Sequence, residues 1–92
     1  MRTKNAARIT PAESAHMVRV KAMPCSVCDH PAPSEAHHIK QGQHFTTVAL
    51  CADCHRGYNG WHGNKAYWRV RKLDELGALN ITLGNLAARG LA

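Results

Sequence analysis

The sequence predicts a single small α+β domain, residues 1–92, that depends on a bound metal ion. Three observations lead to this prediction. A chain of 92 residues buries only a modest core, and domains of this size often rely on a metal or a disulfide. Helical patterns flank a central segment rich in β-branched residues. Four cysteines form two Cys-x2-Cys pairs, which is the ligand spacing of structural zinc sites.

The N-terminal part predicts a flexible basic tail over residues 1–9 and a helix over residues 10–21. Thr10 suits the N-cap and Pro11 suits the first helical position, and Glu13 strengthens this helix start. The candidates for its core-facing side are Met17, Val18 and Val20.

The centre of the chain predicts a β-hairpin followed by a short helix. Residues 36–40 and 45–50 have strand character, the second segment through its β-branched side chains. Gln41-Gly42-Gln43 is expected to form the turn between them. A short helix should begin in residues 51–56, before the glycine-rich segment 57–63.

Two further helices are predicted toward the C-terminus. The first starts at Asn64 or Lys65, runs to Leu76 and stops at Gly77. The second covers residues 80–89, where apolar residues recur at helical spacing. This apolar stripe consists of Leu79, Leu83 and Leu86.

Basic charge lies on both sides of the cysteine region. Twelve Lys and Arg oppose six Asp and Glu, and residues 1–24 hold five basic residues and one acid. Residues 65–72 hold four basic residues and no acid, whereas residues 25–64 hold two basic residues and three acids. In this distribution, basic residues on both sides of the cysteine region would bind a polyanion at the edges of a site. We therefore expect a nucleic acid partner.

The chain is expected in the cytoplasm, and in that of the bacterial host if a phage encodes it. No stretch is long enough to span a membrane, and residues 1–14 lack the apolar run of a signal peptide. A reducing cytoplasm disfavours structural disulfides, so the cysteines are predicted to hold one structural zinc ion through four thiolates. The predicted ligands are Cys25, Cys28, Cys51 and Cys54.

Other uses of these cysteines are weaker interpretations. Two disulfides, or a histidine in place of one cysteine, would also be compatible with the spacing. The run Cys51-Ala52-Asp53-Cys54-His55 matches a haem attachment signature. Haem attachment would need export from the cytoplasm and would leave the first cysteine pair unexplained.

The histidines are the candidate catalytic groups, because a zinc ion closed by four cysteines has no open position. His37 and His38 are neighbours on a predicted strand and should point to opposite faces. His55 directly follows the second cysteine pair and can meet one of them to hold a divalent metal. The other histidine would stay metal-free and accept a proton from water.

Two segments resemble HNH, or ββα-metal, nucleases. They are Ala36-His37-His38-Ile39-Lys40 and TTVALCADCH over residues 46–55, where such enzymes often have N-L-x-x-L-C-x-x-C-H. The resemblance covers residues 16–83. It implies an α+β fold with a ββα-metal core and flanking N- and C-terminal helices, and a metal-dependent hydrolysis of DNA phosphodiester bonds. Many enzymes of this fold act as dimers, so a homodimer is compatible with it.

The resemblance also implies a role for each matching residue. His38 would be the general base, while His37 and His55 would bind a catalytic divalent metal. Asn59 or His62 would be the third ligand. Such a histidine-rich site suits Zn, Ni or Mn better than Mg. Thr46 stands where the family usually has a bracing asparagine, a role that His44 or Gln43 would take.

A further likeness concerns residues 60–65, Trp68 and residues 73–76. They look like the small phage nucleases of the RecA-dependent Ref type, which implies a recombinase filament as partner and a role in DNA recombination. The candidate DNA-binding residues are Lys40, Arg56, Lys65, Arg69, Arg71 and Lys72.

Two hypotheses compete with the DNA endonuclease. The first is a non-catalytic zinc-binding module that binds nucleic acid, which the same cysteines and basic flanks would serve. The second is a zinc domain for protein interaction, whose DNA binding would show little salt dependence. The pairing of His37-His38 with the later Cys-x2-Cys-His run favours the enzyme.

Overall fold

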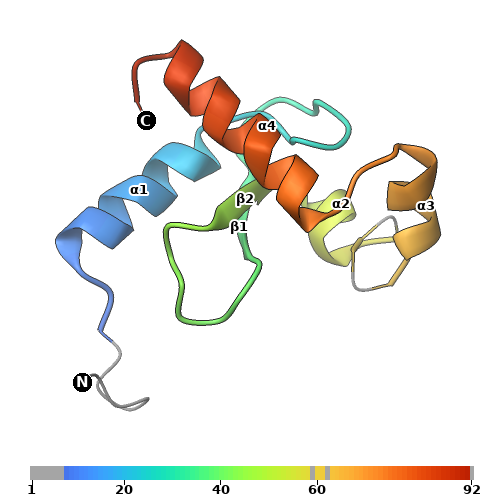
Figure 1. Cartoon of the computed structure of the whole chain (residues 1–92), viewed down its shortest axis with the longest axis horizontal. Helices are drawn as coiled ribbons and strands as arrows, with labels where there is room; N and C mark the ends of the chain where they lie inside the picture. The colour runs from blue at the N-terminus through green and yellow to red at the C-terminus, as the bar shows by residue number, and fades with distance from the viewer. Residues whose placement is uncertain (1–7, 59, 62, 92) are drawn as a thin grey trace.

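The computed structural model describes residues 8–58, 60–61 and 63–91. Within these ranges the chain forms a two-stranded sheet and four helices, which confirms the α+β class (Figure 1). The elements in chain order are α1 (Pro11–Lys21), β1 (Glu35–His38), β2 (Thr47–Leu50), α2 (Ala52–Arg56), α3 (Lys65–Val70) and α4 (Glu75–Ala88). Among the described residues, no helix has the length and apolar character needed to cross a membrane.

Helix α1 begins where its sequence predicts. Thr10 Oγ1 accepts from the backbone N–H of Glu13 at 3.1 Å, and Glu13 Oε1 accepts from the backbone N–H of Thr10 at 2.8 Å. This reciprocal capping box satisfies two helix-end donors. Val20 is fully buried, whereas Val18 lies on the exposed side of the helix.

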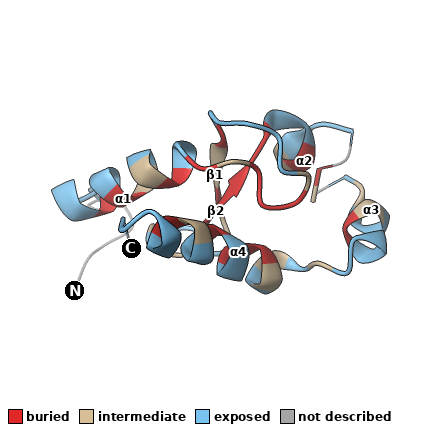
Figure 2. Ribbon diagram, turned by 90° about the horizontal axis from the view of Figure 1, so that it is seen from above, coloured by how far each residue is buried: buried red, intermediate tan, exposed pale blue. Residues whose placement is uncertain are grey.

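The predicted hairpin is confirmed. Strands β1 and β2 pair antiparallel, with Glu35 opposite Leu50 and His38 opposite Thr47. Every residue of β2 is buried, because α1 packs against the sheet and α4 runs along β2 (Figure 2). Strand β1 is only partly covered, and this leaves room beside its histidines.

A polar link fastens β2 to α4. Thr82 Oγ1, fully buried in α4, accepts from the backbone N–H of Ala49 at 3.1 Å and lies 2.7 Å from Ser26 Oγ. The backbone N–H of Ser26 in turn donates to the carbonyl of Ala49 at 2.9 Å. These bonds fix the register of α4 against the sheet and join the first cysteine pair to β2.

The region after Trp68 differs from the prediction of one helix that stops at Gly77. Helix α3 ends at Val70, and Lys72 adopts a left-handed backbone with φ of 57°. Asp74 then caps α4 by accepting from the backbone N–H of Gly77 at 2.7 Å. Gly77 therefore lies in the first turn of α4, since a strong N-cap outweighs its weak helix propensity.

Helix α4 accordingly begins at Glu75 rather than near residue 80. Its buried side includes Ala78, Thr82 and Leu86, which are spaced four residues apart. Leu79 is also buried, but Leu83 is 38% exposed, so the predicted leucine stripe is only partly correct.

Two apolar clusters form the core. One joins Val48, Leu50 and Trp68 to the cysteines, and the other joins Val20, Met23 and Leu86. The cysteines therefore belong to the wall of the larger cluster. Trp68 is fully buried in the larger cluster. Trp61 packs against that cluster, with its ring centroid 4.9 Å from that of Trp68.

Candidate metal centre and histidine cavity

The four cysteines converge from two distant parts of the chain. Their sulfur atoms all lie within 4.8 Å of one another, and all four are free thiols. Cys28 Sγ and Cys51 Sγ are 3.7 Å apart, which is close to the edge of about 3.8 Å expected for a tetrahedron with Zn–S bonds of about 2.3 Å. The cluster could therefore hold a structural metal such as zinc, as predicted. The disulfide alternative does not match these free thiols.

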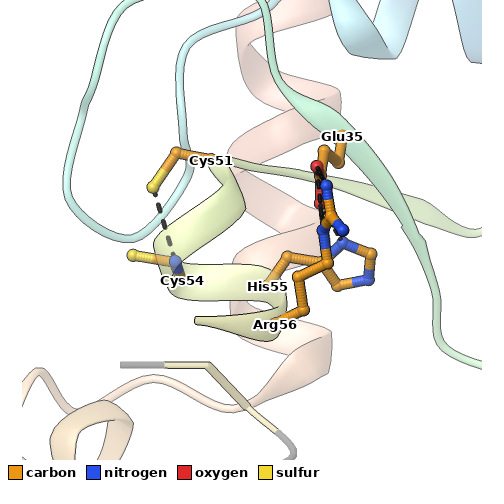
Figure 3. Close-up of polar contacts among 5 residues, drawn as sticks. All are labelled: Glu35, Cys51, Cys54, His55 and Arg56. Carbon is orange, nitrogen blue, oxygen red and sulfur yellow. Dashed lines mark hydrogen bonds and ion pairs between the residues drawn. The ribbon is translucent and has the colours of Figure 1, made fainter. Parts of the chain in front are cut away.

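Backbone N–H groups point at the sulfurs. Cys51 is the N-cap of α2, and its sulfur accepts from the backbone N–H of Cys54 at 3.5 Å (Figure 3). The backbone N–H of His30 hydrogen-bonds to Cys28, while the side chain of His30 is exposed. Such bonds stabilise thiolate charge, which is the form that binds metal.

Burial is the largest influence on the pKa values of Cys25, Cys28 and Cys54. It raises the pKa of Cys28 and of Cys54, and for Cys54 the neighbouring charge of Cys25 raises the pKa further. Burial also acts on Cys25, but backbone N–H groups, first that of Cys28, lower its pKa overall. Four thiolates this close repel one another, so full ionisation of the cluster needs a cation among them.

A second site lies beside β1. A cavity of about 540 Å³ opens between β1, α2 and the start of α4. The predicted residues His37, His38 and His55 all line it. The cavity wall is completed by Ala36, Ile39, Gln41, Trp61, Lys65 and Glu75.

His37 and His55 meet as the hairpin argument predicts. Their ring centroids are 5.0 Å apart, with the rings edge to face at 76°. His37 is buried at the floor, with 2% of its side chain exposed, whereas His55 is 23% exposed. The hairpin supplies one imidazole and α2 supplies the other, since α2 starts directly after β2.

Each of these two imidazoles contacts a carboxylate. His37 Nε2 lies 2.5 Å from Glu75 Oε2, and His55 Nδ1 lies 2.7 Å from Glu35 Oε1. Arg56 holds Glu35 in place, with Nη2 donating to Oε2 at 2.7 Å and Nε donating to Oε1 at 3.0 Å. Arg56, followed by His55, lowers the pKa of Glu35, so this carboxylate is ionised at neutral pH.

Figure 3 shows how α2 connects the two sites. The sulfurs of Cys51 and Cys54 lie on one side of this short helix, and His55 and Arg56 extend on the other side toward Glu35. A structural metal at the cysteines would therefore hold the helix that positions His55.

His38 has a different environment. Its Nε2 lies 2.9 Å from Nδ1 of His44, and no carboxylate is within bonding distance of it among the described residues. Burial lowers the pKa of His38, and the nearby His44, His37 and His55 lower it further. The imidazole is therefore held in its neutral form, in which one ring nitrogen can accept a proton.

Of the predicted basic residues, one lines the cavity and the others lie elsewhere on the described surface. Lys65 lines it, with Nζ 5.1 Å from the ring centroid of Trp61. The guanidinium carbon of Arg71 lies 5.3 Å from the ring centroid of Tyr67. Arg56 forms an ion pair with Glu35, although its side chain is 72% exposed. The remaining predicted basic residues, Lys40, Arg69 and Lys72, are exposed. Asn59 and His62 lie outside the described residues.

Sequence reasoning missed Glu35 and Glu75. Glu35 stands two residues before His37 on β1, so strand periodicity places both on one side of the strand, where His55 also lies. That signal was present in the sequence. No local signal marks Glu75, because its approach to His37 depends on how α4 packs.

Among the described residues, only the four cysteines form a group of three or more metal-binding side chains whose ligand atoms converge. His37 and His55 contribute two candidate ligands to the cavity. No family model, curated protein or solved structure matches this chain.

Proposed function

We propose that this chain is a metal-dependent DNA endonuclease that hydrolyses phosphodiester bonds. In this proposal a structural zinc at the cysteines supports the hairpin and α2 as a ββα-metal core. The supporting observation is that His37, His38 and His55 line one cavity with different partners. His37 and His55 each contact a carboxylate, whereas the hydrogen-bond partner of His38 is a second imidazole.

This difference in partners supports the assigned roles. Histidines that bind metals usually donate their second ring N–H to a carboxylate or carbonyl. His37 and His55 have such partners, so they fit a catalytic divalent ion, with Asn59 or His62 as the third ligand. A divalent cation bound there would stabilise the negative charge on the leaving oxygen. Mg, Mn, Zn and Ni are the candidate ions.

His38 acts as the general base in this proposal. Its neutral imidazole accepts a proton from the attacking water, and His44 restrains the ring from the hairpin turn. His44 thus takes the place of the asparagine that Thr46 replaces. Positioned general bases typically contribute about 10²- to 10⁴-fold to rate.

The basic side chains bind the substrate backbone. Lys65 and His38 line the same cavity, so Lys65 is the basic residue proposed to contact a phosphate that approaches His38. With Lys40, Arg69, Arg71 and Lys72 exposed around the molecule, most contacts would be to phosphates. Phosphate contacts carry no base sequence, so cleavage is expected to be sequence-tolerant and binding strongly salt-dependent.

The experiment is nicking of supercoiled and single-stranded DNA by the zinc-loaded protein. Mg, Mn, Ni or Zn is added in turn, with and without a recombinase filament on the DNA. Wild type is compared with His38→Ala, and His30→Ala serves as control because its side chain is exposed and outside the cavity. We expect cleavage by wild type and His30→Ala, and its loss in His38→Ala. Cleavage only with the filament would support a role in recombination. Equal cleavage by His38→Ala would exclude it as the base.

A second candidate is a non-catalytic zinc module that binds nucleic acid. It is favoured by the finding that only the cysteines converge on a common metal position within the described chain. Salt-sensitive DNA binding by wild type, without cleavage under any of these conditions, would support this module and reject the enzyme.

A further inference from the structure

Glu75 connects the C-terminal helix to the histidine cavity. It is the first residue of α4, and its Oε2 lies 2.5 Å from Nε2 of His37, which is 38 residues earlier in the chain. His37 is 2% exposed and Glu75 is 24% exposed, and both line the cavity. A short hydrogen bond of this kind, with one partner buried, is well shielded from water.

The fold leaves the start of α4 little freedom beside β1. Asp74 caps the helix, and Thr82 bonds to Ala49 of β2 two turns further along. Leu79 and Leu86 are buried on the same helix. Thr82 and these buried leucines hold the helix in place, and the side chain of Glu75 is directed at β1.

We propose that Glu75 is a positioning residue for His37. Its carboxylate accepts from Nε2–H, which fixes the tautomer and the orientation of this imidazole in the cavity. The effect on metal binding rests on the proposed function, in which His37 binds a divalent cation and does so more tightly when its ring is oriented. Loss of such a carboxylate partner typically weakens metal binding by about 10- to 100-fold.

Glu75 could instead serve only to stabilise the start of α4. An acidic residue in the first helical turn also interacts favourably with the helix dipole. Asp74 provides the matched control, because Asp74→Ala removes the N-cap of the same helix without touching His37. If Glu75 served only the helix, Asp74→Ala would reproduce the effects of Glu75→Ala.

The test uses the zinc-loaded chain of residues 1–92 as wild type, Glu75→Ala, Glu75→Gln and Asp74→Ala. Imidazole ¹⁵N NMR at about pH 8, above the usual imidazole pKa of about 6.5, reports the His37 tautomer without added metal. Binding of Mn²⁺ alone is then followed by the EPR signal of the free ion, since Mn²⁺ prefers imidazole and carboxylate to thiolates.

We expect His37 to be the Nε2–H tautomer in wild type, Asp74→Ala and Glu75→Gln, whose amide oxygen still accepts. Glu75→Ala should lose this preference and bind Mn²⁺ about 10- to 100-fold more weakly. An unchanged tautomer and unchanged Mn²⁺ affinity in Glu75→Ala would overturn the proposal, as would the same losses in Asp74→Ala. If wild type binds no Mn²⁺, the metal-dependent function fails, and the tautomer measurement alone decides the role of Glu75.

Discussion

His38 on β1 and His44 in the hairpin turn face each other, with Nε2 of the first 2.9 Å from Nδ1 of the second. Their ring centroids are 5.0 Å apart and the planes are nearly perpendicular, at 84°. One nitrogen of this pair must donate and the other accept, so the contact defines the orientation of both rings.

If His38 is the general base as proposed, replacement of His44 is expected to lower the rate of cleavage. His44→Ala should lower kcat by about 10- to 100-fold, less than loss of the base itself, which typically costs about 10²- to 10⁴-fold. His44→Asn, which keeps a hydrogen-bonding group, should retain more activity. The kcat is measured by nicking of supercoiled DNA. An unchanged kcat in His44→Ala would show that His44 does not contribute to catalysis.

If the four cysteines hold a structural zinc ion, loss of one cysteine is expected to abolish zinc binding and the folded structure together. Cys51→Ser isolates the metal contribution, because serine is a good N-cap and preserves the start of α2. Zinc content by elemental analysis should fall from about one ion per chain, as four thiolate ligands predict. Cooperative thermal unfolding should be lost as well, and His30→Ala should keep both. A zinc-free Cys51→Ser protein that still unfolds cooperatively would contradict a structural role for the metal.

The ion pair of Glu35 and Arg56 is expected to make stability depend on acid pH. Arg56 lowers the folded-state pKa of Glu35 below its ordinary value of 4.5. The pair therefore stabilises the fold above pH 4.5, and this contribution is lost as the pH falls through the lowered pKa. Urea midpoints of wild type and Glu35→Gln should differ at neutral pH and converge below pH 4.5. A difference that stays constant with pH would show that the carboxylate charge is not involved.

Trp68 is expected to contribute strongly to stability. Its side chain is fully buried against Val48, Leu50 and the cysteines. Trp68→Ala should lower the free energy of unfolding by about 3–5 kcal/mol, from lost burial and the cavity left behind. Val70→Ala on the same helix is the control, since Val70 is 82% exposed and should change stability by less than about 0.5 kcal/mol. Equal effects of the two substitutions in urea denaturation would contradict this packing.

Features that depend on neighbours in the chain were predicted from the sequence. The capping box of Thr10 and Glu13 and the hairpin depend on residues that are close together in the chain. The two cysteine pairs were recognised because their residue type and spacing are typical of metal ligands. The meeting of His37 with His55 also followed from local order, because α2 begins directly after β2.

Only the tertiary structure decided which groups surround these histidines. The N-cap at Asp74 outweighed the weak helix propensity of Gly77, so α4 starts at Glu75. The packing of Thr82 and Leu86 against β2 then placed Glu75 beside His37. The physical reason is that residue periodicity indicates which side of an element is buried. The contact between Glu75 and His37 depends instead on the packing of two elements that are far apart in the chain.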